Sequence, residues 1–315
     1  MGEKNAREGC SAVTVEVERL SGEDHLASYD INREYQAHFF NEHAPLYPWP
    51  KMLRSAGLNR VFKPREAMWK VAFESLGLKP GDKILDVGCG SGIWLDRLRQ
   101  QFGVDGVGVD ISTNSLKDAV HASSKDISFL GGDISYLPFQ DTFFDVVYSL
   151  DVLEHVVEQD SCLREMVRVL KPGGRLLLWT LNQKQRYTWN WWLERIGVDI
   201  YERVAHDPTL FPDVSEVHQQ LSSEGVTVQK LELFNAFFTL ALDEAIMVIV
   251  NLFNRLDFFR GEDKLTEFIG RVFLWVTDSM SRNLLRFLHW LDQPWIKRGY
   301  SNGFLVIARK NVSVE

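Results

Sequence analysis

The stretch Leu85-Asp86-Val87-Gly88-Cys89-Gly90-Ser91-Gly92 decides the fold of this chain. A short apolar run, 83–87, leads into it, and a helical pattern starts directly after it at Ile93. Glycines at alternate positions let a chain turn sharply and bring its backbone close to a ligand. The first amides of a helix that follows such a turn attract an anionic group. A dinucleotide-binding loop would have its third glycine at position 93, so Ile93 disfavours NAD or FAD.

Short apolar runs and amphipathic segments alternate outward from this loop. We expect strands at 83–87, 104–109, 127–130, 144–150, 175–180, 226–234 and 303–308, and helices at 93–101, 114–122, 161–170 and 214–223. The segment Lys171-Pro172-Gly173-Gly174 predicts a turn before the fifth strand. The pattern indicates an α/β fold: a Rossmann-like, seven-stranded, mostly parallel sheet with helices on both faces and a helical insertion between the last two strands.

The same pattern divides the chain into five parts. We expect a disordered N-terminus (1–22), an N-terminal helical segment (23–80) with helices at 29–40 and 65–76, a ligand-binding core (81–235), an apolar helical insertion (236–292) and a last strand with the C-terminus (293–315). One extended domain with an insertion is the simplest interpretation.

Composition excludes several classes of protein. The formal charge of −8 argues against a general nucleic-acid binder, which needs a basic surface. Cys10, Cys89 and Cys162 form no CxxC pair, so they predict neither a disulfide framework nor a zinc site. The first twenty residues lack the apolar core of a signal peptide, and no apolar run is long enough to span a bilayer. We therefore expect a cytoplasmic protein, with contact at a membrane surface left open.

The ordered motifs resemble those of the class I S-adenosylmethionine (SAM)-dependent methyltransferases, in the type 11 group. The glycine loop matches that family's Asp-x-Gly-x-Gly-x-Gly signature. Further matches are Val107-Gly108-Val109-Asp110, Gly132-Asp133-Ile134, Phe144-Asp145-Val146-Val147 through Leu153-Glu154-His155-Val156, and Leu170-Lys171-Pro172-Gly173-Gly174. The resemblance implies SAM as the cofactor.

The resemblance also implies which residues bind that cofactor. Asp110 would accept hydrogen bonds from the ribose hydroxyls, and Asp133 one from the adenine amino group, with Ile134 adding a backbone amide and an apolar contact. Asp86 would balance the cofactor's ammonium group or fix the loop. The full predicted cofactor set is Asp86, Gly88, Cys89, Gly90, Gly92, Asp110, Ile111, Asp133, Ile134 and Ser149.

Asp151, Glu154 and His155 are the catalytic candidates. They follow the fourth strand, where ligands bind in open α/β sheets, and their i, i+3, i+4 spacing predicts one face of a helical turn. His155 as a general base, a divalent cation held by all three, and a purely structural role stay open, and we assign no metal ligands. The segment lacks Asn/Asp-Pro-Pro-Tyr, which lowers the odds of methylation at a planar nitrogen.

More narrowly, the chain resembles the ubiquinone-pathway O-methyltransferases through Thr180-Leu181-Asn182, His206-Asp207 and Phe211-Pro212. Gln183 stands where those enzymes have arginine, and Val204-Ala205 replace their Gly-Thr. The resemblance implies that 182–207 forms a lid that meets the membrane. Tryptophan, tyrosine and arginine alternate in that segment, as at a bilayer interface or over an apolar substrate.

The apolar insertion 236–292 must be covered by something. Two interpretations, which are compatible with each other, stay open: an ordinary helical cap packed on the sheet or in a homodimer interface, and a cap that docks on a membrane or a lipid substrate. The leading hypothesis is SAM-dependent O- or C-methylation of a small apolar or lipid-linked acceptor. Methylation of a sugar or secondary metabolite, and a non-catalytic SAM-binding protein, are the alternatives.

Overall fold

The computed structural model describes residues 22–42, 64–198, 201, 206–245, 284 and 286–312. Residues 1–21, for which we expect disorder, lie outside these described residues. So does most of the insertion, residues 246–283. Within them, no helix combines the length and the apolarity that crossing a bilayer requires.

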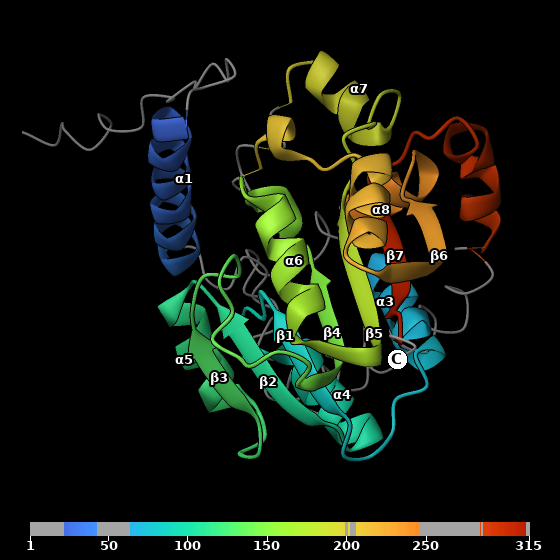
Figure 1. Cartoon of the computed structure of the whole chain (residues 1–315). Coiled ribbons are helices and arrows are strands. Elements are labelled where there is room, and N and C mark those ends of the chain that lie inside the picture. The colour runs from blue at the N-terminus through green and yellow to red at the C-terminus, as the bar shows by residue number, and fades with distance from the viewer. Residues whose placement is uncertain are drawn as a thin grey trace, which may run out of the picture.

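A seven-stranded sheet in the order β3-β2-β1-β4-β5-β7-β6 forms the centre of the molecule (Figure 1). The strands are β1 (Lys83–Val87), β2 (Asp105–Asp110), β3 (Ser128–Gly131), β4 (Phe144–Leu150), β5 (Leu170–Leu181), β6 (Val226–Phe234) and β7 (Gly303–Lys310). The first five pair in parallel, whereas β7 runs antiparallel to both β5 and β6. This confirms the predicted fold class, including the long segment between the last two strands.

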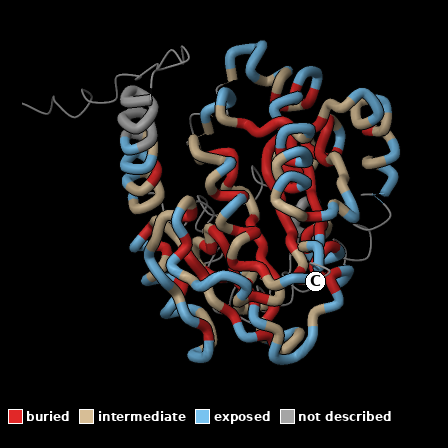
Figure 2. Tube along the Cα trace, in the orientation of Figure 1, coloured by how far each residue is buried: buried red, intermediate tan, exposed pale blue. Residues whose placement is uncertain are grey.

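Helices cover both faces of the sheet. The helices are α1 (Gly22–Glu42), α3 (Pro64–Ser75), α4 (Ile93–Phe102), α5 (Thr113–Ala122), α6 (Gln159–Val169), α7 (Trp189–Arg195) and α8 (Val214–Ser223), with short 3-10 turns η1 (Leu153–His155) and η3 (Pro208–Leu210). Residues of α6 and α8 pack in one core cluster, and residues of α3 and α4 in the other. Buried residues follow the strands (Figure 2).

Alternate side chains along a strand belong to different core clusters, because they lie on opposite faces of the sheet. On β5, Leu176 and Leu178 join the α6–α8 cluster, whereas Leu177 and Trp179 join the α3–α4 cluster. Successive side chains of a strand point to opposite faces, so a strand covered on both sides is apolar throughout. This is why residues 176–179 of β5 form an unbroken apolar run in the sequence.

The turn predicted at Lys171–Gly174 is wrong as a break before the fifth strand. The ladder pairs Phe144 with Leu170 and then Val146 with Arg175, so the segment is an irregularity inside β5. Gly173 has φ +74°, which accommodates the extra length of chain. The strand therefore starts directly where α6 ends.

The insertion is described only at its two ends. Residues 238–245 and 286–296 are helical. The Asp292 carboxylate accepts hydrogen bonds from the backbone amides of Phe237 (3.1 Å) and Phe238 (2.8 Å). Asp292 is fully buried, so this cap fixes the end of the insertion against its beginning.

Candidate functional site

The glycine loop lies at the carboxyl end of β1, beside the ends of β2 and β4. Gly88 has φ +79°, and a Cβ there would come 2.2 Å from the Val152 side chain, so only glycine fits. Gly90 has φ +50°, but a Cβ there would meet nothing within 4 Å. Gly92 precedes the first turn of α4. The loop is therefore tight against β4 on one side and open at Gly90, where its backbone can approach a ligand.

Asp110 at the end of β2 is tied to this loop. Its Oδ2 accepts a 2.7 Å hydrogen bond from the Gly90 amide, and its Oδ1 accepts a 2.8 Å bond from the Ser112 amide. Burial raises the pKa of this carboxyl, while hydrogen bonds from the amides of Ser112, Gly90 and Ile111 oppose the shift. Ile111 thus helps to hold Asp110 through its backbone.

Asp86 lies under the loop rather than at its open side. It is 3% exposed, and its Oδ2 accepts a 2.7 Å hydrogen bond from the Tyr148 hydroxyl on β4. Desolvation by burial raises the pKa of Asp86 to about 8; the bond from Tyr148 lowers it and the nearby Asp110 raises it further. Of the two roles expected for Asp86, the contact with Tyr148 fits fixing the loop. No sequence motif pointed to Tyr148.

The buried side chains of Ser149 and Cys89 lie near the end of β1. The buried Ser149 hydroxyl donates a 2.9 Å hydrogen bond to the carbonyl of Val87, which joins β4 to the end of β1. Cys89 is 9% exposed, and burial raises the pKa of its thiol. The Cys89 thiol is therefore a packing group under the loop, not a nucleophile.

Asp133 and Ile134 follow β3 at the neighbouring strand end. Asp133 Oδ1 accepts from the Ser135 amide at 2.8 Å, and its Oδ2 lies 3.7 Å from Arg33 Nη1 on α1. Ile134 is 7% exposed and belongs to the α6–α8 core cluster. The apolar contact expected from Ile134 is thus already made within the protein.

The helical turn predicted for Asp151, Glu154 and His155 is wrong. Asp151 has φ +56° and precedes the 3-10 turn η1, so it does not share a helical face with the other two. Its Oδ1 instead accepts a 2.9 Å hydrogen bond from the indole of Trp179, and its amide donates to the Trp179 carbonyl. Asp151 thereby joins the end of β4 to β5.

Glu154 and His155 meet a third residue, His206, which is not among the catalytic residues predicted from the sequence. Glu154 is fully buried, and its Oε2 accepts a 2.8 Å hydrogen bond from the Thr180 hydroxyl. The rings of His155 and His206 lie 4.6 Å apart, and ligand atoms of all three residues lie within 4.8 Å of one another. A carboxylate and two imidazoles can hold a divalent cation with a position left open, or move a proton.

Large apolar side chains are exposed in the segment 182–207. Trp192 is 47% and Ile196 72% exposed, and the Arg195 guanidinium lies 4.7 Å from the centre of the Trp191 ring. Trp189 meets Phe237, which stacks on Trp295, so the segment 182–207 packs against the start of the insertion and the 286–296 helix. Phe287 and Trp290 add further exposed rings on the 286–296 helix.

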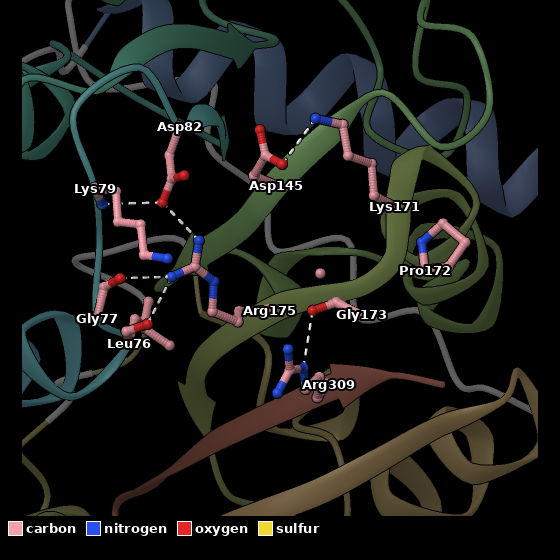
Figure 3. A pocket seen from close by; sticks show the side chains of 11 residues that line it. Leu76, Gly77, Lys79, Asp82, Asp145, Lys171, Pro172, Gly173, Arg175 and Arg309 are labelled. Atoms are coloured by element: carbon pink, nitrogen blue, oxygen red, sulfur yellow. Dashed lines mark hydrogen bonds and ion pairs between the residues drawn. The ribbon is translucent and has the colours of Figure 1, made fainter. Parts of the chain in front are cut away.

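A cavity of about 430 Å³ lies at the opposite ends of the strands (Figure 3). Its lining includes two ion pairs: Arg175 with Asp82 at 2.6 Å and Lys171 with Asp145 at 2.7 Å. The guanidinium of Arg175 also donates to the carbonyls of Leu76 and Gly77. These contacts hold α3 and the start of β1 against β5. None of the predicted site residues lines this cavity.

Comparison with known protein families and curated sequences finds methyltransferases. Residues 85–178 match the family model of the methyltransferase domain. The chain is 30% identical over 215 residues to the demethylmenaquinone methyltransferase of Paenarthrobacter aurescens, covering 64% of this chain and 82% of that protein. It is 31% identical over 155 residues to methyltransferase GfsG of Streptomyces halstedii, of which it spans only 55%.

A solved structure shows the same fold at low identity. The phosphoethanolamine N-methyltransferase 2 of Haemonchus contortus, in complex with SAM, superposes with a TM-score of 0.52 and 20% identity. The match covers 76% of this chain and 51% of that one.

Proposed function

The chain belongs to the SAM-dependent methyltransferase family, and from that premise we propose that it transfers a methyl group to a small apolar or lipid-linked acceptor, at oxygen or carbon. The observation that carries the proposal is the meeting of two features at one sheet edge. The open glycine loop with Asp110 lies at the ends of β1 and β2. The buried Glu154 and His155 follow β4, and the partly exposed His206 joins them.

The residues of the first feature fit the cofactor. The Gly90 backbone is open to a ligand, and the Asp110 carboxylate suits the two ribose hydroxyls. Asp133 suits the adenine amino group. Gly88, Cys89, Gly92, Ser149 and Asp86 shape the loop, and Ile111 and Ile134 support the two acids through the backbone and the core.

The second feature suits an acceptor that must lose a proton. When bound, SAM supplies an electrophilic methyl group on sulfur. His155, whose ring lies perpendicular to that of Phe40 with 5.2 Å between the centroids, would take the proton of an acceptor hydroxyl or acidic carbon. Glu154 would stabilise the imidazolium that forms, and His206 would orient the His155 ring or bind a cation together with it. Asp151 would act by holding the end of β4.

We infer the class of acceptor from the exposed side chains of the segment 182–207. Exposed aromatic and apolar side chains with interleaved arginines suit an anionic bilayer or an apolar substrate. The name of the Paenarthrobacter aurescens relative points to a quinone acceptor for that protein, which agrees with this class. We propose peripheral membrane contact through 182–207 and 236–292; a homodimer would cover the same surface. The net charge of −8 speaks against a nucleic-acid acceptor.

An acceptor panel tests the proposal. The full chain is incubated with isotope-labelled SAM and hydroquinones, a lipid extract, sugars and phenolic metabolites, and the products are identified by mass spectrometry. Methylation of a quinol or lipid is the expected result. Methylation of sugars alone would favour a sugar or secondary-metabolite methyltransferase. S-adenosylhomocysteine binding without turnover on any acceptor would favour a non-catalytic SAM-binding protein.

A further inference from the structure

Helix α1 lies outside the segment that matches the family model and packs against α5 (Figure 1). Three of its residues, Arg33, Gln36 and Phe40, are spaced by three and four positions. Residues at this spacing share one face of a helix. Each of the three contacts the protein or is buried, whereas Glu34 on the far side is exposed.

The two ends of this face meet the two halves of the proposed site. Arg33 Nη1 lies 3.7 Å from Asp133 Oδ2, at the strand end assigned to adenine. The Phe40 ring meets the His155 ring edge-on, with 5.2 Å between centroids. The face from Arg33 to Phe40 therefore runs across the site from the adenine side toward the acceptor side.

The C-terminal end of α1 is fixed beside Asp110. Asn41 Oδ1 accepts hydrogen bonds from the Asn114 amide at 3.1 Å and the Ser112 hydroxyl at 3.1 Å, and the Asn114 side chain donates back to the Asn41 carbonyl at 2.9 Å. Ser112 is the residue whose amide binds Asp110 Oδ1. One polar junction thus joins α1, the start of α5 and the proposed ribose-binding acid.

Gln36 lies on α1 between Arg33 and Asn41, and its side-chain oxygen lacks a hydrogen-bond donor among the described residues. It is only 7% exposed, and its Oε1 is buried without a hydrogen-bond donor among the described residues. Buried amide oxygens in folded proteins nearly always have a donor, so an exception needs an explanation. Gln36 shares its helix face with Arg33, which meets Asp133, and with Phe40, which meets His155, so it lies on the face of α1 that borders the proposed site.

We propose that α1 is a wall of the cofactor site and that Gln36 is a further cofactor-binding residue. Its Oε1 accepts a hydrogen bond from an adenine nucleoside, either from the amino group of the base or from a ribose hydroxyl. Both groups are hydrogen-bond donors, and Gln36 Oε1 is an acceptor without a donor among the described residues. This inference rests on the proposed function, because it takes Asp110 and Asp133 as the nucleoside-binding acids.

Calorimetry on the full chain with S-adenosylhomocysteine tests the inference. Gln36→Leu keeps the side-chain size and removes the acceptor, so we expect the Kd to rise about tenfold, as for one lost hydrogen bond between buried groups. The matched control is Glu34→Leu on the exposed face of α1, which should leave the Kd unchanged. Adenosine alone, used as a second probe, should lose affinity by the same factor in Gln36→Leu.

Three results would overturn the inference. They are an unchanged Kd in Gln36→Leu, an equal rise in Glu34→Leu, and a loss for S-adenosylhomocysteine that adenosine does not share.

If Gln36→Leu does not fold, hydrogen exchange on the wild-type chain decides: S-adenosylhomocysteine should protect the α1 amides from Arg33 to Asn41, and unchanged exchange there would overturn the inference. Asp110→Ala separates the two proposals. If it weakens binding and Gln36→Leu does not, only the present inference fails.

Discussion

The amide of Gly90 donates a 2.7 Å hydrogen bond to the carboxylate of Asp110, across the gap between the first two strands. The second oxygen of the same carboxylate accepts from Ser112, at the start of α5. One acid therefore sets the position of the glycine loop and of the next helix at once. In the proposed cofactor site, Asp110 would both fix the glycine loop and bind the nucleoside, so its loss should lower cofactor affinity.

Asp110→Ala should weaken binding of S-adenosylhomocysteine by about 1–3 kcal/mol, the cost of a lost pair of charge-assisted hydrogen bonds. Isothermal calorimetry measures it. Asp105→Ala is the control, because Asp105 begins the same strand at its far end and its side chain is 62% exposed. Equal affinities for Asp110→Ala and the wild type would contradict the assignment.

His155→Ala should slow methyl transfer by about 100-fold or more, as expected when a general base is removed, with cofactor affinity retained. Single-turnover rates and calorimetry separate the two quantities. His218→Ala is the matched control, since His218 lies exposed on α8. Normal turnover in His155→Ala would remove this residue from the mechanism.

His206→Ala should lower turnover as His155→Ala does, because the two rings and Glu154 form one cluster. Dialysis against a chelator then shows how the cluster works. Activity that is lost and returns with a divalent cation indicates a metal; activity that persists indicates proton transfer by histidine alone. Full activity in His206→Ala would show that its closeness to His155 has no catalytic meaning.

Asp86 should make the stability of the chain fall with rising pH. Its pKa is about 8 in the folded chain and near 3.8 when unfolded, so between these values only the folded state keeps the proton. The stabilisation is complete below about pH 4 and is lost as the pH rises toward 8, by up to about 1.4 kcal/mol per pH unit. Denaturant unfolding of wild type and Asp86→Asn from pH 5 to 8 measures it. Parallel pH curves for the two would contradict the shift.

Replacing Trp192 and Ile196 together by serine should reduce binding to vesicles of anionic phospholipid about tenfold or more, since each side chain would bury apolar area in the bilayer. Co-sedimentation with vesicles measures it. Val120→Ser is the control, because Val120 is 61% exposed on α5, away from the lid. If the wild type does not bind vesicles but sedimentation shows a dimer that the double variant lacks, the surface is a subunit interface.

The local pattern predicted much of the fold. Strands β1 and β4 and helix α8 have the predicted bounds, because a run of apolar residues ended by glycine or a polar cap is a local signal. The insertion site before β7 was also predictable. The Lys171–Gly174 segment was not, because its four residues read as a stop whether the chain leaves the sheet or bulges within it.

The site was predictable only where one segment carried it. The glycine loop and Asp110 follow consecutive strands, and parallel strands bring their ends together. Asp151 was misplaced because its partner, the Trp179 indole, comes from β5 and draws it away from a helical turn. His206 and Phe40 contact His155 from the segment 182–207 and from α1. Residue spacing within one segment cannot predict contacts between segments so far apart in the sequence.

The last strand of the chain, β7, sits between β5 and β6 and pairs with both. During synthesis on the ribosome, β5 and β6 must therefore wait, each with an open hydrogen-bonding edge, until Gly303–Lys310 has emerged. The nascent protein is exposed to wrong strand pairing throughout that interval, and chaperone demand should be highest then. A premature stop codon before Gly303 would leave both edges permanently open, so the truncated protein should aggregate rather than fold.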